Sequence, residues 1–497
     1  MSRPIEEFKR TAESVAAIAN AQLVGDSATI ITGLTLSSKE VQEGDLFIAL
    51  PGEKSHGADF AAEAISLGAV AVLTDAVGAA KIKDVPVIIS VNPRRAAGVI
   101  SAWFYSEPMR DLYSVGVTGT NGKTTVTTLL HQIMSAAGRE SGLIGTVETR
   151  IGDEVIASKR TTPESSDLQA LSAVMRERHM RNLVMEVSSH AIALERVRGS
   201  HFAVVAFTNL SQDHLDFHKT MQAYFEAKAK LFTFEFADLA VINIDDAYGR
   251  QLAENLPAGL QCIRTSSQGR EADLRAEALA LGLDGMRFML VHGAERAAVA
   301  SSLLGRFNAD NLLAVAGVLI ADGMGLDEVA ALLGRLSPVD GRMSRLGGMH
   351  GKPLVVVDYA HTPDALAAAL AALRPEASGK LVVLFGCGGD RDPGKRAMMG
   401  KVACKIADEV IITDDNPRSE DPASIRSAIL QSCDKAAEIV PRDKAIASTL
   451  GNLVAGDVLL IAGKGHETGQ LIGNETLPFD DASVANNKIR TMREVLQ

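Results

Sequence analysis

A glycine-rich segment that ends in a lysine and two hydroxyls is the part of the chain best suited to chemistry. It reads Thr118-Gly-Thr-Asn-Gly-Lys-Thr-Thr125. Glycines let backbone N–H groups curl around phosphate oxygens, and a helix N-terminus adds partial positive charge. Lys123 can reach the outer phosphates of a triphosphate, and the Thr124 hydroxyl can bind Mg²⁺. Val117 stands where the standard phosphate-loop pattern has its first glycine. The segment predicts a nucleotide site; a plain tight turn between a strand and a helix is the alternative.

Two further polar side chains follow or end apolar segments. Glu186 lies inside the apolar run LVMEVSS, and a buried carboxylate is costly unless something compensates it. Beside a triphosphate the compensating cation is Mg²⁺; the alternative is an ordinary glutamate at the exposed end of a strand. His214 follows another apolar run. Because a lone histidine is more often a structural hydrogen-bonding group than a ligand, the residues alone leave His214 in that role.

Sheets must bring these residues together. A short strand at 112–117 precedes the loop, and helical spacing of apolar residues follows it as far as Gly138. The strands predicted at 182–187 and 201–207 have polar tails, and ligands of open α/β sheets bind beyond the carboxyl ends of strands. The last third alternates strands with helical stretches, and polar clusters follow four of its strands. These clusters predict a second binding surface that faces the first. The predicted strands of the last third are 354–357, 381–385, 409–413, 438–440 and 458–462, with a helix at 363–373.

The fold class is predicted to be α/β, in three domains. Residues 1–109 form a small α/β domain, with strands at 30–36, 45–50, 69–74 and 85–90, and Ser37 and Ser38 as turn hydroxyls. A polar, proline-containing break at 106–110 sets the first boundary. Residues 110–338 form a phosphate-loop α/β domain, and residues 339–497 form a Rossmann-like α/β domain. Other alanine-rich stretches are interpreted as helices.

Composition limits the functional class. The 497 residues suggest about three domains, and the net charge of −11 makes the chain a poor non-specific binder of nucleic acid. Its four cysteines lack C-x-x-C spacing, which disfavours disulfides and zinc. The first residues contain no signal peptide, and no run of eighteen apolar residues could span a membrane. We therefore expect a cytoplasmic protein that binds neither nucleic acid nor membrane, and we expect a monomer.

Five blocks together are highly specific. They are TGTNGKTT at 118–125, MEVSSHAIALERV at 185–197, TNLSQDHLDFH at 208–218, GRFNADNLLAVAG at 305–317, and the polar clusters of the last domain. With these blocks the chain resembles the Mur ligase family along its whole length. DNPR at 415–418 with GDRDPGKR at 389–396 is similar to the family members that add diaminopimelate. The resemblance implies an ATP-dependent ligase that joins meso-2,6-diaminopimelate to UDP-N-acetylmuramoyl-L-alanyl-D-glutamate through an acyl phosphate, in peptidoglycan synthesis.

The resemblance also implies roles for residues. Lys123, Glu186, His214 and Lys228 would be catalytic. Thr124 and Glu186 would hold one Mg²⁺, and His214 with Lys228 a second, because a lysine in the motif Tyr224-Phe-Glu-Ala-Lys228 carries a carbamate in this family. The residues alone predict Lys228 to be an exposed helix lysine, with Lys230 a rival only if the register differs.

Three binding sets follow from the same resemblance. The ATP set is Gly119, Thr120, Asn121, Gly122, Lys123, Thr124, Thr125, Asn308, Asn311 and Arg342. The UDP-substrate set is Leu36, Ser38, Glu53, Lys54, Ser55, Thr161, Thr162, Ser188 and Arg196. The diaminopimelate set is Arg391, Asp415, Asn416, Pro417, Arg418, Gly463 and Glu467. The chain has Ser37 and Lys39 where some relatives have Asp and Arg, and Leu194 where some have Gln.

Arg418 decides the expected acceptor. Diaminopimelate differs from lysine by one carboxylate, and a guanidinium can bind a carboxylate through two parallel hydrogen bonds. The alternative for Arg418 is a surface arginine at a helix start. The rival functions are a lysine-adding ligase, a folylpolyglutamate synthase, and a nucleotide-dependent regulatory protein that forms no bond. Since the nucleotide loop and the acceptor cluster lie in different predicted domains, we also expect the domains to close on substrate.

Overall fold

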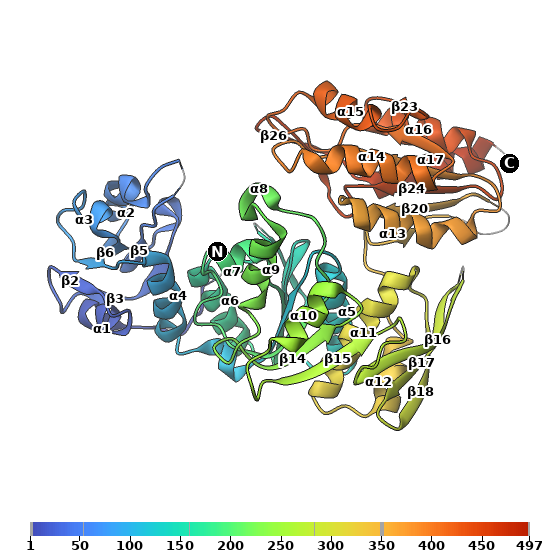
Figure 1. The fold of residues 1–497 in the computed structure, drawn as a ribbon. Helices are drawn as coiled ribbons and strands as arrows, with labels where there is room; N and C mark the ends of the chain where they lie inside the picture. The colour runs from blue at the N-terminus through green and yellow to red at the C-terminus, as the bar shows by residue number, and fades with distance from the viewer. Residues whose placement is uncertain (1–2, 53, 159, 283, 348–351, 496–497) are drawn as a thin grey trace.

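The computed structural model describes residues 3–52, 54–158, 160–282, 284–347 and 352–495. Each of the three predicted parts of the chain carries its own main sheet with helices against it. Figure 1 shows the N-terminal part (blue) beside the central part (cyan to yellow), and the C-terminal part (orange to red) above it. The predicted α/β class is confirmed.

The N-terminal sheet has the strand order β2-β7-β6-β5-β4. Its helix α4 packs against α6 of the central part, because Ala170 and Ala173 of α6 belong to the same buried core as Ile100 and Phe104 of α4. This shared core fixes the N-terminal part against the central one. The elements are β1 (Arg10–Thr11), α1 (Ala12–Ile18), β2 (Gln22–Val24), β3 (Ile30–Ile31), β4 (Gly33–Thr35), β5 (Asp45–Ile48), α2 (Ala61–Ser66), β6 (Ala69–Thr74), α3 (Ala76–Ala79), β7 (Val87–Ile89) and α4 (Pro93–Phe104).

The central sheet has the order β11-β10-β9-β12-β8-β13-β14-β15-β16-β17-β18. Its parallel strands are buried on both faces: Val115 and Val117 of β8 face the core under α5 and α11, whereas Leu183 and Met185 of β12 face the core under α6 and α9. The strands are β8 (Tyr113–Thr118), β9 (Ser141–Ile144), β10 (Glu148–Ile151), β11 (Glu154–Ala157), β12 (Asn182–Glu186), β13 (Phe202–Phe207), β14 (Ala237–Asn243), β15 (Gln261–Ser266), β16 (Leu274–Gly282), β17 (Gly285–His292) and β18 (Glu295–Ser301). The helices are α5 (Lys123–Ala136), α6 (Ser165–Glu177), α7 (Ser189–Ala193), α8 (Leu215–His218), α9 (Met221–Ala229), α10 (Ala247–Glu254), α11 (Arg306–Ala321) and α12 (Leu326–Leu333).

The C-terminal sheet has the order β19-β20-β24-β21-β22-β23, with buried cores on both faces. It follows the predicted doubly wound pattern. A hairpin of β25 and β26 pairs with the DNPR segment through a bridge between Arg418 and Ile472. The elements are β19 (Ser344–Arg345), β20 (Leu354–Asp358), α13 (Pro363–Leu373), β21 (Leu381–Phe385), α14 (Gly394–Ile406), β22 (Glu409–Ile412), α15 (Pro422–Leu430), β23 (Ala436–Glu438), α16 (Arg442–Asn452), β24 (Val458–Ala462), β25 (Gly469–Ile472), β26 (Glu475–Pro478) and α17 (Asp481–Val495).

Most predicted elements are confirmed, and three expectations are wrong. The strand predicted at 438–440 is β23 at Ala436–Glu438, because these residues pair with β22. The single strand predicted at 30–36 is two short strands, because β3 pairs with β1 whereas β4 pairs with β5. Alanine-rich stretches are not all helical: β16 and β18 contain repeated alanines and are antiparallel partners of β17. In β18 every second residue is buried, which is the strand period.

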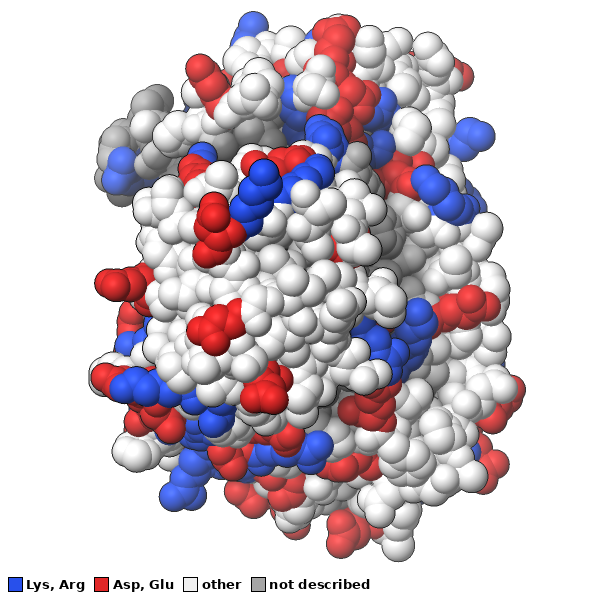
Figure 2. Space-filling model, turned by 90° about the vertical axis from the view of Figure 1, so that its left-hand side faces the viewer, with Lys and Arg blue, Asp and Glu red and all other residues white. Residues whose placement is uncertain are grey.

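Among the described residues, none of the helices combines the length and the apolarity needed to cross a bilayer. Figure 2 shows a broad uncharged area on one face, bordered by Lys, Arg, Asp and Glu side chains of mixed sign. That face therefore lacks the single-sign surface that is typical of nucleic-acid binding.

Candidate active site

The phosphate loop joins β8 to α5 as predicted. Gly119 and Gly122 have φ of +149° and +90°, and a Cβ on either would lie within 2.4 Å of a side-chain oxygen of the neighbouring Thr208 or Asn311. Lys123, at the first turn of α5, donates through Nζ to the carbonyls of Gly119 (3.0 Å) and Thr120 (2.9 Å). Glycine is needed at these two positions because no side chain fits.

Glu186 is the buried carboxylate expected at the end of β12. Its side chain is only 1% exposed. Oε1 accepts hydrogen bonds from the Thr124 hydroxyl (3.0 Å) and from the backbone N–H of Thr146 (2.8 Å), and Oε2 accepts one from the Thr146 hydroxyl (3.1 Å). The structure thus places Thr124 and Glu186 together, with a hydroxyl and a carboxylate oxygen side by side. These are donor types that Mg²⁺ prefers.

Lys228 is buried, so the expectation of an exposed lysine is wrong. It is 1% exposed, whereas Lys230 is exposed. Its Nζ donates to the Gly119 carbonyl (2.8 Å) and lies 4.7 Å from the centre of the Tyr224 ring. Burial, and secondarily the charge of Lys123, lowers the pKa of Lys228 well below its ordinary value. The protein therefore favours the neutral amine at this position.

His214 and Asp213 form a polar pair beside the loop. His214 Nε2 lies 3.4 Å from Asp213 Oδ2, and His361 of the C-terminal part reaches the same oxygen at 3.8 Å. Burial lowers the pKa of His214 to about 3, although Asp213 opposes the shift. Burial opposes ionisation of Asp213, but the hydrogen bond from His361 and the nearby cations outweigh it and lower its pKa. His214 is thus held neutral, the form that can bind a metal.

The acceptor cluster is held by a network inside the C-terminal part. Arg418 has φ of +53°, and its Nη1 donates to the Gly389 carbonyl (2.8 Å). Glu467 accepts from Asn416 Nδ2 (2.7 Å) and from Lys464 Nζ (3.0 Å). Sequence reasoning missed Lys464, which is 0% exposed and also donates to the side-chain oxygen of Asn416 (3.1 Å). The lysine of the Gly463-Lys-Gly-His-Glu467 cluster was its only signal, and its partner lies 48 residues away.

One cavity of about 330 Å³ joins the two half-sites. Central residues and C-terminal residues line it together, so the polar strand ends face one another as expected. From the central part come Thr120, Asn121, Gly122, Lys123, Thr124, Thr161, Glu186, Ser188, His214 and Lys228. From the C-terminal part come Arg342, Tyr359, His361, Gly388, Arg391, Lys395, Asp415, Asn416, Arg418, Gly463 and Glu467. Pro417 is not in the lining; its carbonyl lies against Gly389.

A second cavity of about 360 Å³ adjoins the loop on the other side. Thr125 and Asn311 line it, and Asn311 Nδ2 donates to Asn308 Oδ1 (2.9 Å). Arg342 lines both cavities, and its Nη2 donates to the Thr124 hydroxyl (3.0 Å). Asn308 and Asn311 therefore stay candidates for the base side of a nucleotide, while Arg342 lies between the base side and the phosphate side.

The expected UDP-substrate residues are split between two parts of the chain. Thr162 is buried and donates to the Glu186 carbonyl (2.9 Å), and Arg196 reaches the Thr162 carbonyl (3.5 Å). The N-terminal members are not in the lining of the 330 Å³ cavity: Leu36 packs on the N-terminal core, Ser38 begins a short 3₁₀ turn, and Lys54 and Ser55 are exposed. Glu53 lies outside the described residues.

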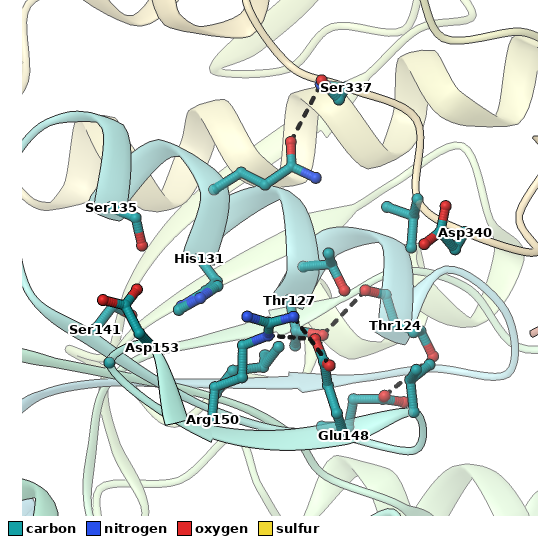
Figure 3. Close-up of a pocket in the computed structure, with 18 of the residues that line it drawn as sticks. Thr124, Thr127, His131, Ser135, Ser141, Glu148, Arg150, Asp153, Ser337 and Asp340 are labelled. Carbon is teal, nitrogen blue, oxygen red and sulfur yellow. Dashed lines mark hydrogen bonds and ion pairs between the residues drawn. The ribbon is translucent and has the colours of Figure 1, made fainter. Parts of the chain in front are cut away.

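A larger cavity, of about 1070 Å³, lies behind α5 and was not expected. Figure 3 shows polar side chains of α5, among them Thr127, His131 and Ser135, facing Glu148 and Arg150 of β10. The segment between α12 and β19 closes one side, where the Ser337 N–H donates to the Gln132 side chain (3.1 Å). Thr124 and Glu186 line this cavity too, but residues 119–122 do not.

A buried histidine of the C-terminal part, His466, should make the protein less stable in acid. Burial lowers the pKa of His466 to about 3, with Arg342 adding to the shift, and its ring lies 5.1 Å from that of Tyr359. In the unfolded chain His466 binds a proton near pH 6.5, whereas in the folded chain it does so only at about pH 3. The free energy of unfolding is therefore undiminished by this site above pH 6.5 and falls as the pH drops towards 3. Between pH 7 and pH 5 this site should remove about 2 kcal/mol from the free energy of unfolding.

Urea unfolding of the wild type and of His466→Gln at these two pH values measures the effect. The variant should lose less stability in acid, and His292→Gln on β17 should behave like the wild type. An identical acid loss in His466→Gln and the wild type would contradict the assignment.

Comparisons with known proteins agree with this architecture. Family models match residues 117–319 (Mur ligase middle domain), 341–465 (Mur ligase, glutamate ligase domain) and 30–105 (Mur ligase family, catalytic domain). A UDP-N-acetylmuramoyl-L-alanyl-D-glutamate–2,6-diaminopimelate ligase of Xylella fastidiosa (strain 9a5c) is 45% identical over 468 residues, 93% of this chain and 94% of the relative. The enzyme of the same name from Bacillus velezensis is 43% identical over 92% of this chain and 94% of the relative.

Solved structures give the same picture. A UDP-N-acetylmuramoyl-L-alanyl-D-glutamate–2,6-diaminopimelate ligase matches with a TM-score of 0.69 and 32% identity, over 98% of this chain and 100% of that chain. MurF ligase from Thermotoga maritima in complex with ADP shares the fold at a TM-score of 0.60 and 19% identity, over 93% and 97%. Matched over nearly its full length, the chain belongs to the Mur ligase family.

Proposed function

We propose that this chain is an ATP-dependent ligase that adds meso-2,6-diaminopimelate to UDP-N-acetylmuramoyl-L-alanyl-D-glutamate during peptidoglycan precursor synthesis. The observation that carries the proposal is the cavity in which Lys123 and Lys228 face Arg418. The relatives at 43–45% identity that bear the name of this enzyme support the choice of substrates.

The reaction needs ATP because a carboxylate is a poor electrophile. Transfer of the terminal phosphoryl group to the γ-carboxylate of D-glutamate makes an acyl phosphate, and the amine of diaminopimelate then attacks its carbonyl and expels phosphate. Catalysis of this kind is mostly positioning and neutralisation of charge. The loop N–H groups and Lys123 would hold the phosphates, and release of Lys123 from the two loop carbonyls is the local change that nucleotide binding requires.

Mg²⁺ fits the donors present. Thr124 and Glu186 would hold one ion, and His214 with a carbamate on Lys228 would hold another. When bound, Mg²⁺ supplies positive charge to the phosphate oxygens. The lowered pKa of buried Lys228 supports the carbamate, because it favours the neutral amine, the form that reacts with CO₂, over an ammonium that would repel the metal.

Substrate binding divides among the three parts of the chain. Leu36, Ser38, Lys54 and Ser55 with Thr161, Thr162, Ser188 and Arg196 would bind the UDP-sugar dipeptide. Diaminopimelate would lie between Arg418 and the group formed by Glu467, Asn416 and Lys464. The Arg418 guanidinium would bind the carboxylate of diaminopimelate that lysine lacks. We also propose that the enzyme acts in the cytoplasm as a monomer.

Phosphate release is the test. The protein is assayed with ATP, the UDP-dipeptide and a panel of amino acids. We expect release that depends on the UDP-dipeptide and on meso-diaminopimelate. Release with L-lysine but not with meso-diaminopimelate would support the lysine-adding alternative, and release without any amino acid would support a nucleotide-dependent regulatory protein.

A further inference from the structure

Lys395 is a buried cation that the reaction described above leaves without a role. It is the second residue of α14 and belongs to the GDRDPGKR cluster. Its side chain is 5% exposed, yet it lines the 330 Å³ cavity opposite the phosphate loop. No carboxylate of a described residue lies within 4.0 Å of its Nζ. Its stem is buried and its ammonium reaches the cavity without an ion-pair partner, so this wall of the cavity presents a positive charge that suits an anion.

The acidic side chains in the lining of this cavity are Glu186, Asp213, Asp415 and Glu467, and each already has a partner. Asp415 Oδ1 accepts a hydrogen bond from the backbone N–H of Asn416 (2.6 Å). Glu186 is held by Thr124 and Thr146, and Glu467 by Asn416 and Lys464. Asp213 is the carboxylate that feels the charge of Lys395, but it is occupied by its own histidine neighbours. The thirteen residues of α14 add the partial positive charge of a helix N-terminus near Lys395. The missing partner is therefore a ligand.

Two anionic groups are expected in this cavity, the terminal phosphate of ATP and the carboxylates of diaminopimelate. The position of Lys395 favours the phosphate. Gln212 donates to Asp392 (3.4 Å), so the loop before α14 lies against the segment that carries Asp213 and His214. Lys395 is thus on the part of the C-terminal wall next to the phosphate side. Arg418 is instead held to Gly389 and to the β25 hairpin, on the DNPR segment.

We propose that Lys395 binds the phosphoryl group while it passes from ATP to the γ-carboxylate, as a catalytic residue contributed by the C-terminal part. This inference rests on the proposed function. In the step, the bond between the terminal phosphorus and the bridging oxygen breaks, and its electron pair leaves with ADP. A carboxylate oxygen forms the new bond to phosphorus. Lys395 neither gains nor loses a proton; its N–H groups donate to the non-bridging oxygens.

Positional isotope exchange isolates this step. ATP with a heavy-oxygen label in the bridge between its outer phosphates is incubated with enzyme and UDP-dipeptide, without amino acid. Reversible formation of the acyl phosphate then scrambles the label. Lys395→Met should slow scrambling by about 100-fold, the effect of removing one donor to a transition state. Lys395→Arg should keep at least a tenth of the wild-type rate, because it keeps the charge. Lys401→Met, an exposed lysine of the same helix, should match the wild type.

The outcomes separate the alternatives. Wild-type scrambling in Lys395→Met, with only the KM for the amino acid raised, would overturn the proposal and assign Lys395 to an acceptor carboxylate. The unfolding midpoint shows whether Lys395→Met folds. If it does not, Lys395→Arg is the test, and scrambling below a hundredth of the wild-type rate in that variant would contradict a role for the positive charge at position 395. Absence of scrambling in the wild type itself would count against the proposed function rather than against Lys395.

Discussion

Arg418→Ala should lower kcat/KM for meso-diaminopimelate by two to three orders of magnitude while leaving ATP and UDP-dipeptide binding unchanged. A buried charged contact is worth about 2–5 kcal/mol when one partner is removed, and every 1.4 kcal/mol is tenfold. ATP and UDP-dipeptide binding should not change because Arg418, although it lines the cavity, donates to the Gly389 carbonyl and not to a residue of the phosphate loop. Steady-state kinetics with each substrate varied in turn measures the effect.

The matched control is Arg374→Ala. Arg374 pairs with Asp408 on the same part of the chain and is not in the lining of the cavity, so its loss should leave the kinetics unchanged. Activity with L-lysine, which lacks the second carboxylate, should change little in Arg418→Ala. An unaltered preference for diaminopimelate over lysine in this variant would refute the role given to Arg418.

Lys228→Met should lower kcat by about 100-fold or more and still fold. Met keeps the buried stem and removes only an amine whose charge is already disfavoured, so the loss of packing is small. The substitution removes the nitrogen that would carry the carbamate, and so removes the carbamate oxygens that would bind the metal. We expect this to cost about as much in rate as removing one hydrogen-bond donor to the transition state. Initial rates at saturating substrate give the change in kcat.

A spectroscopic readout tests the modification separately from activity. Carbon NMR of protein prepared with isotopically labelled bicarbonate should show a carbamate signal in the wild type. The signal should be absent from Lys228→Met and retained in Lys230→Met, since Lys230 is exposed on the same segment. A carbamate signal that persists in Lys228→Met would move the modification to another lysine.

Local sequence was sufficient for the phosphate loop. Its glycines, its lysine and the apolar spacing of α5 lie within about twenty residues, so propensity and pattern predicted the strand, the loop and the helix that the structure shows. The nucleotide chemistry of the loop residues stays a prediction. β6, β21, β24 and α13 were likewise predicted at the bounds observed, because each is a continuous apolar or alanine-rich run between clear breaks.

Non-local packing explains what the sequence did not predict. Lys228 lies on a helix of ordinary composition. Its side chain is buried against the phosphate loop, where Nζ donates to the carbonyl of Gly119, 109 residues earlier in the chain. Lys464 donates to the side-chain oxygen of Asn416, which follows a different strand, β22. The strands β16 and β18 contain repeated alanines, which favour helix locally, but antiparallel pairing with β17 prevails.

The cavity behind α5 has a pharmacological consequence. Thr124 and Glu186 line it, whereas residues 119–122 of the glycine loop do not. A small molecule lodged there would contact Thr124 and Glu186, the pair proposed to hold Mg²⁺, without contacting residues 119–122. Cellular ATP could not displace such an inhibitor by competition, so its potency would not decline at millimolar nucleotide, as that of an ATP mimic does.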